Sequence, residues 1–393
     1  MRSGGASMRL AIFITHPVQY HVPIWRGLND RLCGKIGVFY FSDHSVRGAV
    51  DKDFGVGVAW DSGLLNGYRH EFVRRDANVH RTWSIPLGRG REVLATEDLE
   101  AVMIHGYTHL FELEILACAK RLGLRVIMRG EFYDKRPGRR YITAVAREMF
   151  LRYAYARVDA FCYVGRAAET HLRARGISAG RMYFSPYSID TDLFEAQVST
   201  VDRTATRKQL GIVDDSVAIV YSGKLIPRKN PHLLVSAIEA MRDRSRVSLI
   251  IVGDGPLRDE VIRYARHVLG DRLHFQGFQN QSQIGRSLAA ADIFVLPSRY
   301  ETWGLVVNEA MQFGLPVVVT DAVGCHQDLV VDQSTGVVVP ADDVAALSKA
   351  LQRLVDDRAL RQAVGRNARR HIAKYSTAAS VDGIIASLAA LKP

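Results

Sequence analysis

Short apolar runs alternate along the chain with longer amphipathic segments. This alternation predicts parallel β-sheets covered by helices on both faces. The runs that read as strands are residues 9–14, 35–40, 101–104, 124–128, 160–164 and 182–184 in the first half, and 217–222, 247–252, 273–276, 293–296, 316–320 and 336–339 in the second. Helical periodicity is clear over 231–241, 257–268, 282–290 and 344–355. Six strands in each half predict an α/β protein of two Rossmann-like, doubly wound domains.

The domain boundary is expected in the polar stretch near residues 190–207. We therefore predict an N-terminal acceptor-binding domain over 1–191 and a C-terminal donor-binding domain over 192–375, with a last helix at about 376–393 packing back on the first domain. The length of 393 residues suits two or three domains. Open α/β sheets bind ligands at the carboxyl ends of their strands, so ligands are expected in an interdomain cleft lined by those ends.

Composition narrows the class of protein. Hydrophobic residues make up 48% and charged residues 24%, which is typical of a globular chain. The four cysteines form no Cys-x-x-Cys pair, so neither a zinc site nor a disulfide framework is expected. No apolar run is long enough to span a membrane, and no signal-peptide-like segment precedes the first strand. We expect a cytoplasmic protein.

Positive charge is concentrated in the first half of the chain. Residues 1–191 carry 28 basic and 19 acidic side chains, whereas 192–393 carry 24 and 22. The surplus predicts an anionic partner, with an arginine-rich proteome as the alternative explanation. Nucleic acid is disfavoured, because the basic half has no helix-turn-helix or base-stacking signature.

Residues 129–157 hold eight basic side chains against three acidic ones, and their helix interleaves arginines with apolar residues. The pattern fits a helix lying on the inner, anionic membrane surface, which would make the protein peripheral. It fits an ordinary domain helix with solvated arginines equally well. The apolar residues concerned are Tyr141, Met149, Phe150, Leu151, Tyr153 and Tyr155.

Residues 297–320 read as a strand end, a loop, a helix and a strand. Glu301 lies in the loop and Glu309 lies one to two turns into a helix that begins near Leu305. Both carboxylates can reach one ligand at the helix start, where free backbone N–H groups suit a phosphate. The alternative is a plain βα unit with two solvated glutamates.

A second strand end gathers cations. The run 217–222 leads into Gly223-Lys224-Leu-Ile-Pro-Arg228-Lys229, with Asn230 as the expected N-cap of the next helix. Lys224, Arg228 and Lys229 can neutralise a diphosphate. A third strand end reads Gly253-Asp254-Gly, where glycine permits a close backbone approach.

Together these segments resemble the family 4 glycosyltransferases, retaining enzymes of the two-Rossmann GT-B fold. The resemblance covers roughly residues 180–340. It rests on Gly223-Lys-Leu-x-x-x-Lys229, Val252-Gly-Asp-Gly-Pro256, Phe275-Gln-Gly-Phe278, the Glu301 and Glu309 pair with its flanks, and Ser188-Ile-Asp-Thr-Asp-Leu-Phe194.

The resemblance implies that Lys224 and Lys229 hold the diphosphate of a nucleotide sugar. It also implies that Glu309 binds the ribose and Glu301 the transferred sugar. No metal is expected, since the donor half has no Asp-x-Asp at a strand end, and no cofactor is expected, since the nucleotide sugar is a substrate. The further donor-binding residues expected are Gly223, Arg228, Gly253, Asp254, Gln276, Phe278, Thr302, Gly304, Leu305 and Val306.

The first half departs from the family pattern. Thr15–Pro23 is polar and aromatic where the family has a glycine-rich loop, and Arg129-Gly-Glu131 stands where it often has a histidine. We expect His16, Gln19 and Arg129 to bind the acceptor, and His105 or Glu131 to take the catalytic place of the missing histidine. Structural histidines are the alternative. A metal cluster of His16, His21, His105 and His109 is disfavoured by their spacing.

The expected function is retaining transfer of a sugar from a uridine or guanosine diphosphate sugar to an acceptor. A phosphorylated, lipid-linked or cell-envelope saccharide suits the basic half. The departing phosphate could itself accept the acceptor's proton. Transfer to a soluble small molecule, an epimerase of the same fold and a non-catalytic nucleotide-sugar binder remain alternatives.

Overall fold

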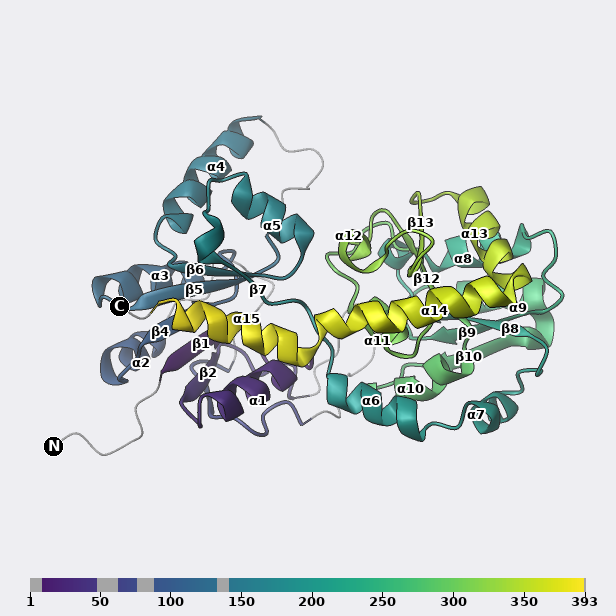
Figure 1. The fold of residues 1–393 in the computed structure, drawn as a ribbon, viewed down its shortest axis with the longest axis horizontal. Helices are drawn as coiled ribbons and strands as arrows, with labels where there is room; N and C mark the ends of the chain where they lie inside the picture. The colour runs from purple at the N-terminus through teal and green to yellow at the C-terminus, as the bar shows by residue number, and fades with distance from the viewer. Residues whose placement is uncertain (1–8, 48–62, 76–87, 133–140, 392–393) are drawn as a thin grey trace. The chain divides into compact units, whose positions relative to one another are not determined.

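The computed structural model describes residues 9–47, 63–75, 88–132 and 141–391. These residues fall into two compact units. The first contains the described residues of 1–49 and 63–187 together with 377–391, and the second spans 188–376. Each unit is built on one parallel sheet (Figure 1).

The sheet of the first unit has strand order β3-β2-β1-β4-β5-β6-β7. Alternate strand residues such as Phe13, Phe39 and Ile104 join one core beneath helices α3, α4 and α5. The strands are β1 (Leu10–Ile14), β2 (Ile36–Tyr40), β3 (His70–Phe72), β4 (Ala101–Ile104), β5 (Arg125–Gly130), β6 (Ala160–Tyr163) and β7 (Met182–Phe184). The helices are α1 (Val22–Arg31), α2 (Gly90–Thr96), α3 (Leu110–Arg121), α4 (Tyr141–Tyr155), α5 (Arg166–Arg173) and α15 (Thr377–Ala389).

The sheet of the second unit has order β10-β9-β8-β11-β12-β13. Its largest core lies between the sheet and helices α8, α9 and α13. The strands are β8 (Val217–Ser222), β9 (Val247–Val252), β10 (Leu273–Gly277), β11 (Ile293–Leu296), β12 (Val317–Thr320) and β13 (Gly336–Val339). The helices are α6 (Thr191–Thr200), α7 (Arg203–Leu210), α8 (Pro231–Glu239), α9 (Arg258–Leu269), α10 (Gln281–Ala290), α11 (Leu305–Gln312), α12 (His326–Leu329), α13 (Val344–Asp356) and α14 (Arg358–Ile372).

The predicted α/β class and all twelve predicted strands are confirmed, but the first sheet has a seventh strand. The added strand, β3, is only three residues long and half-buried, and it pairs with β2 at the sheet edge. Its His-Glu-Phe sequence lacks the apolar run that marks the other strands. A short edge strand held mainly by backbone pairing leaves little hydrophobic signal.

The polar stretch expected to contain the boundary is helical rather than a linker. α6 and α7 cover most of residues 191–210, and the aspartates that precede them, Asp190 and Asp202, cap them by accepting from Leu193 N and Ala205 N. The second unit instead begins at Ser188. The polar residues of this stretch cap helices or face solvent, and a linker would have the same polar composition.

The C-terminal helix α15 is fastened to the first unit by buried polar groups. Arg129 is fully buried and donates to Ser185 Oγ at 3.0 Å and to Ser380 Oγ, on α15, at 3.2 Å. Ser185 Oγ in turn donates to the Ser380 carbonyl at 2.9 Å. α15 also packs against α1, β6 and β7. Arg129 thus joins β5, the turn after β7 and the last helix.

Helix α4 presents two different faces. Leu151, Ala154 and Tyr155 belong to the core, whereas Val145, Met149 and Tyr153 are 44%, 69% and 62% exposed. The three exposed residues recur every fourth position and therefore form one apolar ridge, which we call the α4 ridge. Lys135, Arg136, Arg139 and Arg140, also counted in the basic segment, lie outside the described residues, as do the contacts of the Tyr141 side chain.

Among the described residues, none of the helices combines the length and the apolar character that crossing a bilayer requires. The four cysteines are unpaired, in agreement with the absence of a predicted disulfide framework.

Candidate functional site

The switch point of the second sheet lies between β8 and β11, where strand order reverses. Ligands of doubly wound sheets bind outside the carboxyl ends of the strands at such a point. Gly223–Lys229 follows β8 and Glu301 follows β11. The two strongest sequence motifs are therefore brought together at the predicted edge.

Glycines let the loops at this edge approach closely. Gly253 has φ +132°, and a Cβ there would overlap the carbonyl oxygen of Gly223. Gly255 has φ +151°, and a Cβ there would lie 2.6 Å from the Leu225 carbonyl oxygen. Backbone bonds join the same loops, since Leu225 N donates to Asp254 O at 2.9 Å. The glycines thus support a narrow, backbone-lined edge.

Glu301 accepts from two of the predicted cations. Its Oε2 receives the Lys229 ammonium and lies 3.3 Å from Arg228 Nη1. The Lys229 and Glu301 side chains are only 11% and 13% exposed, so water screens this ion pair weakly. Two cations of the loop 224–229, Arg228 and Lys229, thus share the Glu301 carboxylate. The ion pair was not predicted from the sequence.

Helix α11 begins at Leu305 and contains Glu309 in its second turn, as predicted. Gly304 occupies the N-cap with φ +97°, and no side chain caps the helix start. The backbone amides of the first turn are therefore available to an anion. Glu309 is buried, at 4% exposure. Trp303 Nε1 donates to Asn308 Oδ1 at 3.0 Å and braces the entry to the helix.

Gly324 is a site residue that sequence reasoning missed. A Cβ on Gly324 would overlap the Thr302 carbonyl oxygen, and Gly324 N donates to Glu301 O at 2.9 Å. The segment after β12 therefore fixes the backbone of the Glu301 loop. A glycine soon after a buried strand is the available sequence signal, and it is weaker than that for Gly253, which directly follows its strand.

The remaining predicted donor residues flank this edge. Asp254 accepts from Gly255 N at 2.8 Å and contacts Arg258 at 3.5 Å, so its carboxylate holds the local turn. Gln276 and Phe278 lie at and just beyond the end of β10, half-buried, and Thr302 is exposed beside Glu301. Leu305 and Val306 open α11, both half-buried.

Asn230 holds the N-cap position of α8 but does not cap it with its side chain. Its backbone is left-handed, with φ +50°, and its Nδ2 donates to Asp342 Oδ1 at 2.9 Å. The predicted N-cap position is confirmed, with Pro231 as the first helical residue, but the Asn230 side chain does not bond to the helix start. Asn230 instead ties the lysine loop to the segment after β13.

The first unit gathers polar rings at its own switch point, between β1 and β4. His16 follows β1 and its ring contacts that of His44 in a tilted arrangement, with ring centroids 4.3 Å apart. His21 lies 5.0 Å from His105, which follows β4. Gln19, between His16 and His21, is 7% exposed. The predicted residues His16, Gln19 and His105 thus share this edge, and His44 joins them without having been predicted.

Burial keeps two of these histidines neutral. It lowers the pKa of His21 to about 3, with smaller contributions from Arg129 and His16. It also lowers the pKa of His105 well below the usual value, aided by His21 and Arg129. A neutral imidazole can donate one hydrogen bond and accept another. Within the described part of the chain, His21 Nδ1, His105 Nε2 and Arg129 Nη1 are buried without a hydrogen-bond partner.

Arg129 does not lie on the surface as an acceptor-binding residue would. β5 continues through Gly130, so Arg129 lies inside the sheet, with its guanidinium 5.5 Å from the Tyr187 ring. Glu131 follows the strand, and together with burial it raises the pKa of Tyr187 well above its usual value. Glu131 therefore lies beside this buried group.

Among the described residues, no three His, Cys, Asp or Glu side chains are grouped so that they could hold an ion. His21 and His109 occupy the N-cap positions of α1 and α3, and His109 pairs with Glu112 in a capping box.

Comparison with known proteins identifies the fold and then the family. The structure matches that of HepE from Anabaena in complex with UDP, with a TM-score of 0.72 and 17% identity, over 97% of this chain and all of that one. At this identity the match establishes the GT-B fold, two Rossmann-like domains.

Residues 202–371 match the family model of the group 1 glycosyl transferases. The second unit therefore belongs to the group 1 glycosyltransferase family, and the resemblance drawn from its motifs is confirmed at that level.

Curated relatives support the same assignment. The chain is 31% identical over 220 residues to the alpha-D-kanosaminyltransferase of Streptomyces kanamyceticus, covering 55% of this chain and 56% of that protein. It is 31% identical over 230 residues to a GDP-mannose-dependent monoacylated alpha-(1-6)-phosphatidylinositol monomannoside mannosyltransferase of Corynebacterium glutamicum, covering 56% and 59%. The matches thus span little more than half the length of these relatives.

Proposed function

We propose that the protein transfers a sugar, with retention of configuration, from a nucleoside diphosphate sugar to an acceptor bound by the first unit. The observation that carries the proposal is the cationic loop 223–229 closed on Glu301 beside the uncapped start of α11. The relatives and the neighbour bound to UDP support nucleotide sugars as donors. UDP and GDP sugars are the donors to test.

In this proposal the donor's diphosphate lies against Lys224, Lys229 and the first amides of α11. Cations and amide dipoles that are already in place stabilise charge on the leaving phosphate at no reorganisation cost. Glu309 accepts from the ribose hydroxyls, and Glu301 accepts from the transferred sugar. The cationic side chains of the loop oppose the negative charge that a departing diphosphate carries, so they can supply the neutralisation that a metal supplies elsewhere.

Retention follows if the acceptor attacks from the face that the leaving group occupies. The phosphate oxygen then takes the acceptor's proton, and no separate base is needed. A neutral His105 or Glu131 would orient the acceptor rather than remove its proton. The open hydrogen-bond positions on His21 and His105 support an acceptor rich in hydroxyl groups.

For the acceptor we propose a lipid-linked saccharide presented at the inner membrane face. The α4 ridge supports this choice, because an exposed apolar ridge next to arginines such as Arg152 suits an anionic bilayer surface. One relative is by name a phosphatidylinositol monomannoside mannosyltransferase, whereas another is a kanosaminyltransferase. A soluble small-molecule acceptor is therefore the second candidate.

The donor is found by measuring the melting temperature with UDP, GDP and their hexose conjugates, since a ligand of the native state raises it. The stabilising conjugate is then incubated with candidate acceptors, and released nucleotide diphosphate is measured. Glu309→Gln is expected to lose most binding and release, while the exposed Glu195→Gln retains both.

Conversion of the donor into an epimer without release of nucleotide diphosphate would identify an epimerase instead. Binding without release in the presence of any acceptor class would leave a nucleotide-sugar binding protein. Full activity in Glu309→Gln would remove Glu309 from the site.

A further inference from the structure

A cavity lies at the amino-terminal edge of the sheet in the second unit, opposite the edge that carries the donor motifs. It has a volume of about 510 Å³ and reaches the amino-terminal ends of three strands: Val217 begins β8, Asp292 precedes β11 and Pro316 precedes β12. The donor motifs follow the carboxyl ends of the same strands. The cavity therefore cannot belong to the donor site.

Five arginines and three aspartates line this cavity, together with an apolar wall formed by Phe313, Leu315 and Pro316. Positive charge is thus in excess by two. The volume suits a small molecule. The charged lining residues are Arg203, Arg207, Arg246, Arg358, Arg361, Asp214, Asp215 and Asp292.

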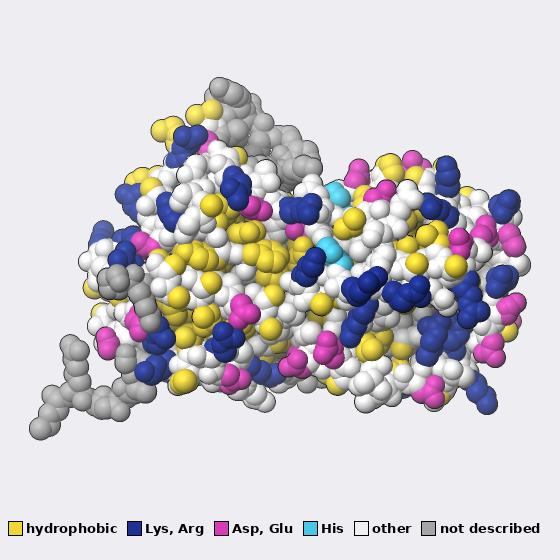
Figure 2. Space-filling view, viewed as in Figure 1, with side chains coloured by type: hydrophobic (Ala, Val, Ile, Leu, Met, Phe, Trp, Pro, Cys, Tyr) yellow, Lys and Arg dark blue, Asp and Glu magenta, His cyan; other side chains and the backbone are white. Residues whose placement is uncertain are grey.

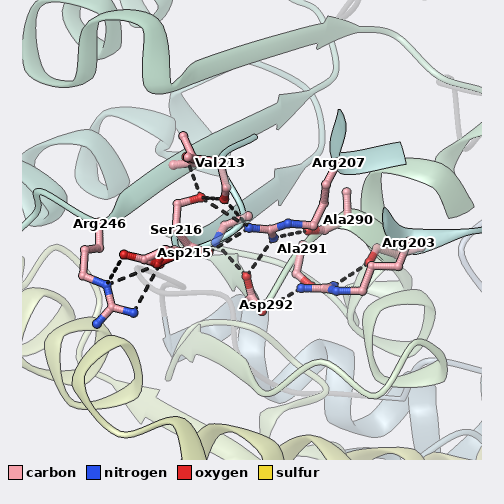
Figure 3. Close-up of polar contacts among 12 residues, drawn as sticks. Arg203, Arg207, Val213, Asp215, Ser216, Arg246, Ala290, Ala291 and Asp292 are labelled. Atoms are coloured by element: carbon pink, nitrogen blue, oxygen red, sulfur yellow. Dashed lines mark hydrogen bonds and ion pairs between the residues drawn. The ribbon is translucent and has the colours of Figure 1, made fainter. Parts of the chain in front are cut away.

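Some of these arginines are fixed by the protein itself (Figure 3). Arg203 and Arg207 point toward Asp292, at 2.8 Å and 3.1 Å, and Arg207 also donates to the carbonyls of Ala290, Val213 and Ser216. Arg246 donates to the Asp215 carbonyl at 3.2 Å. These bonds hold the guanidinium groups in place before any ligand arrives.

Two other arginines of the cavity keep N–H groups that have no hydrogen-bond partner among the described residues. Among the described residues, Arg361 donates through Nη1 alone, to the carbonyls of Leu354 and Val355 at the end of α13. For Arg358 the described residues offer neither a hydrogen bond nor an ion pair, although it lines the same cavity. A guanidinium has five N–H donors, so both retain groups that can bind an anion.

The positive groups also repel one another. Burial lowers the pKa of Arg361, and Arg358, Arg246 and Arg203 lower it further, against the opposing effect of Asp292. The three aspartates therefore do not neutralise the cavity. An anion with several acceptor oxygens would relieve the repulsion and use the free N–H groups, and guanidinium forks match phosphate oxygens in geometry.

We propose that this cavity is a second anion site, which binds a soluble molecule carrying a phosphate or diphosphate group, with Arg358 and Arg361 as its contacts. The site is independent of the proposed glycosyl transfer, and the apolar wall would face the remainder of the ligand. Figure 2 shows Lys and Arg side chains gathered over the second unit, on the surface around α14.

The test is calorimetric titration with inorganic diphosphate in a phosphate-free buffer. Lys229→Gln weakens the donor site, so in this background the part of the binding that a change at Arg358 removes reports the second site. Adding Arg358→Glu is expected to weaken that binding at least about tenfold, because a charge-assisted contact becomes a repulsion. Arg366→Glu, an exposed change on the same helix outside the cavity, is the matched control and is expected to change binding less than twofold.

The proposal is overturned if Lys229→Gln alone abolishes all diphosphate binding, or if the two glutamate variants weaken it equally. A parallel arm measures sedimentation with phosphatidylglycerol vesicles. Loss of vesicle binding in Arg358→Glu, with no binding of free diphosphate by any form, would replace the soluble ligand by a membrane headgroup and would also overturn it.

Discussion

The ion pair between Lys229 and Glu301 allows the donor site to be tested separately from the fold. Lys229→Met removes the ammonium but leaves the Glu301 carboxylate 87% covered, with Arg228 as its remaining cation at 3.3 Å. Breaking a buried pair from one side costs about 3–5 kcal/mol, and the remaining arginine reduces this to about 2–3 kcal/mol. Glu301→Gln likewise leaves the positive charge of Lys229 without its carboxylate partner.

The double variant Lys229→Met with Glu301→Gln removes both charges. We expect it to be destabilised by about 1–3 kcal/mol less than the sum of the single changes, which is the range of coupling between directly contacting residues. Stability would therefore be partly restored. Donor binding would not be restored, because the diphosphate loses its cation in either case.

Stability is measured by urea titration, with amide hydrogen exchange of β8 and β11 reporting the second unit alone. Nucleotide binding is measured by calorimetry on the same samples. Losses of stability that add within about 0.5 kcal/mol would show that the pair is not coupled. Recovery of nucleotide binding in the double variant would refute the role given to Lys229.

Three further predictions concern the backbone and the first unit. Gly253→Ala is expected to abolish nucleotide binding and to lower stability by more than about 2 kcal/mol, because its Cβ would overlap the Gly223 carbonyl. Gly211 also has a positive φ but has open space around it, so Gly211→Ala is expected to cost about 1 kcal/mol on urea titration. Protonating His21 opposes folding, since its pKa is about 3 in the folded chain: its contribution to stability is complete above pH 6.5 and falls by about 2 kcal/mol at pH 5. His105 adds its own loss, so on urea titration the wild type is expected to lose about 2 kcal/mol more than His21→Gln over this range, and equal losses in the two proteins would contradict this. Ser380→Ala removes a hydrogen-bond partner of Arg129, so it is expected to speed amide exchange in α15 and to lower stability by about 1–3 kcal/mol. Ser199→Ala, an exposed change on α6, is expected to leave exchange in α15 unchanged.

The parallel sheets were predictable because buried strands such as Val247–Val252 are apolar throughout and are bounded by turn residues. The candidate donor site, at the carboxyl ends of the strands in the second sheet, was predictable for a related reason. Chemistry-bearing residues directly follow those strands, and the topology places strand ends together. Glu309 could be placed in the second turn of its helix because the sequence shows where the preceding strand, 293–296, ends and where the helix begins, near Leu305.

The features that sequence reasoning missed depend on contacts between distant segments. Gly324 matters because it touches Thr302, and Arg129 is buried because Ser380, 251 residues away, closes over it. The cavity at the amino-terminal edge collects arginines from three separate segments, which no motif connects. In each case the tertiary structure, and not the local pattern, determines the environment of the side chain.

The central claim is that loop 223–229 and Glu301 form the binding site of a nucleoside diphosphate sugar. The most direct measurement is calorimetric titration of the stabilising nucleotide sugar into the wild type, Lys229→Met and Lys208→Met, where Lys208 is an exposed lysine of α7. The account predicts one donor site in the wild type, unchanged affinity in Lys208→Met, and at least about tenfold weaker binding in Lys229→Met. Equal affinities in all three proteins would contradict it.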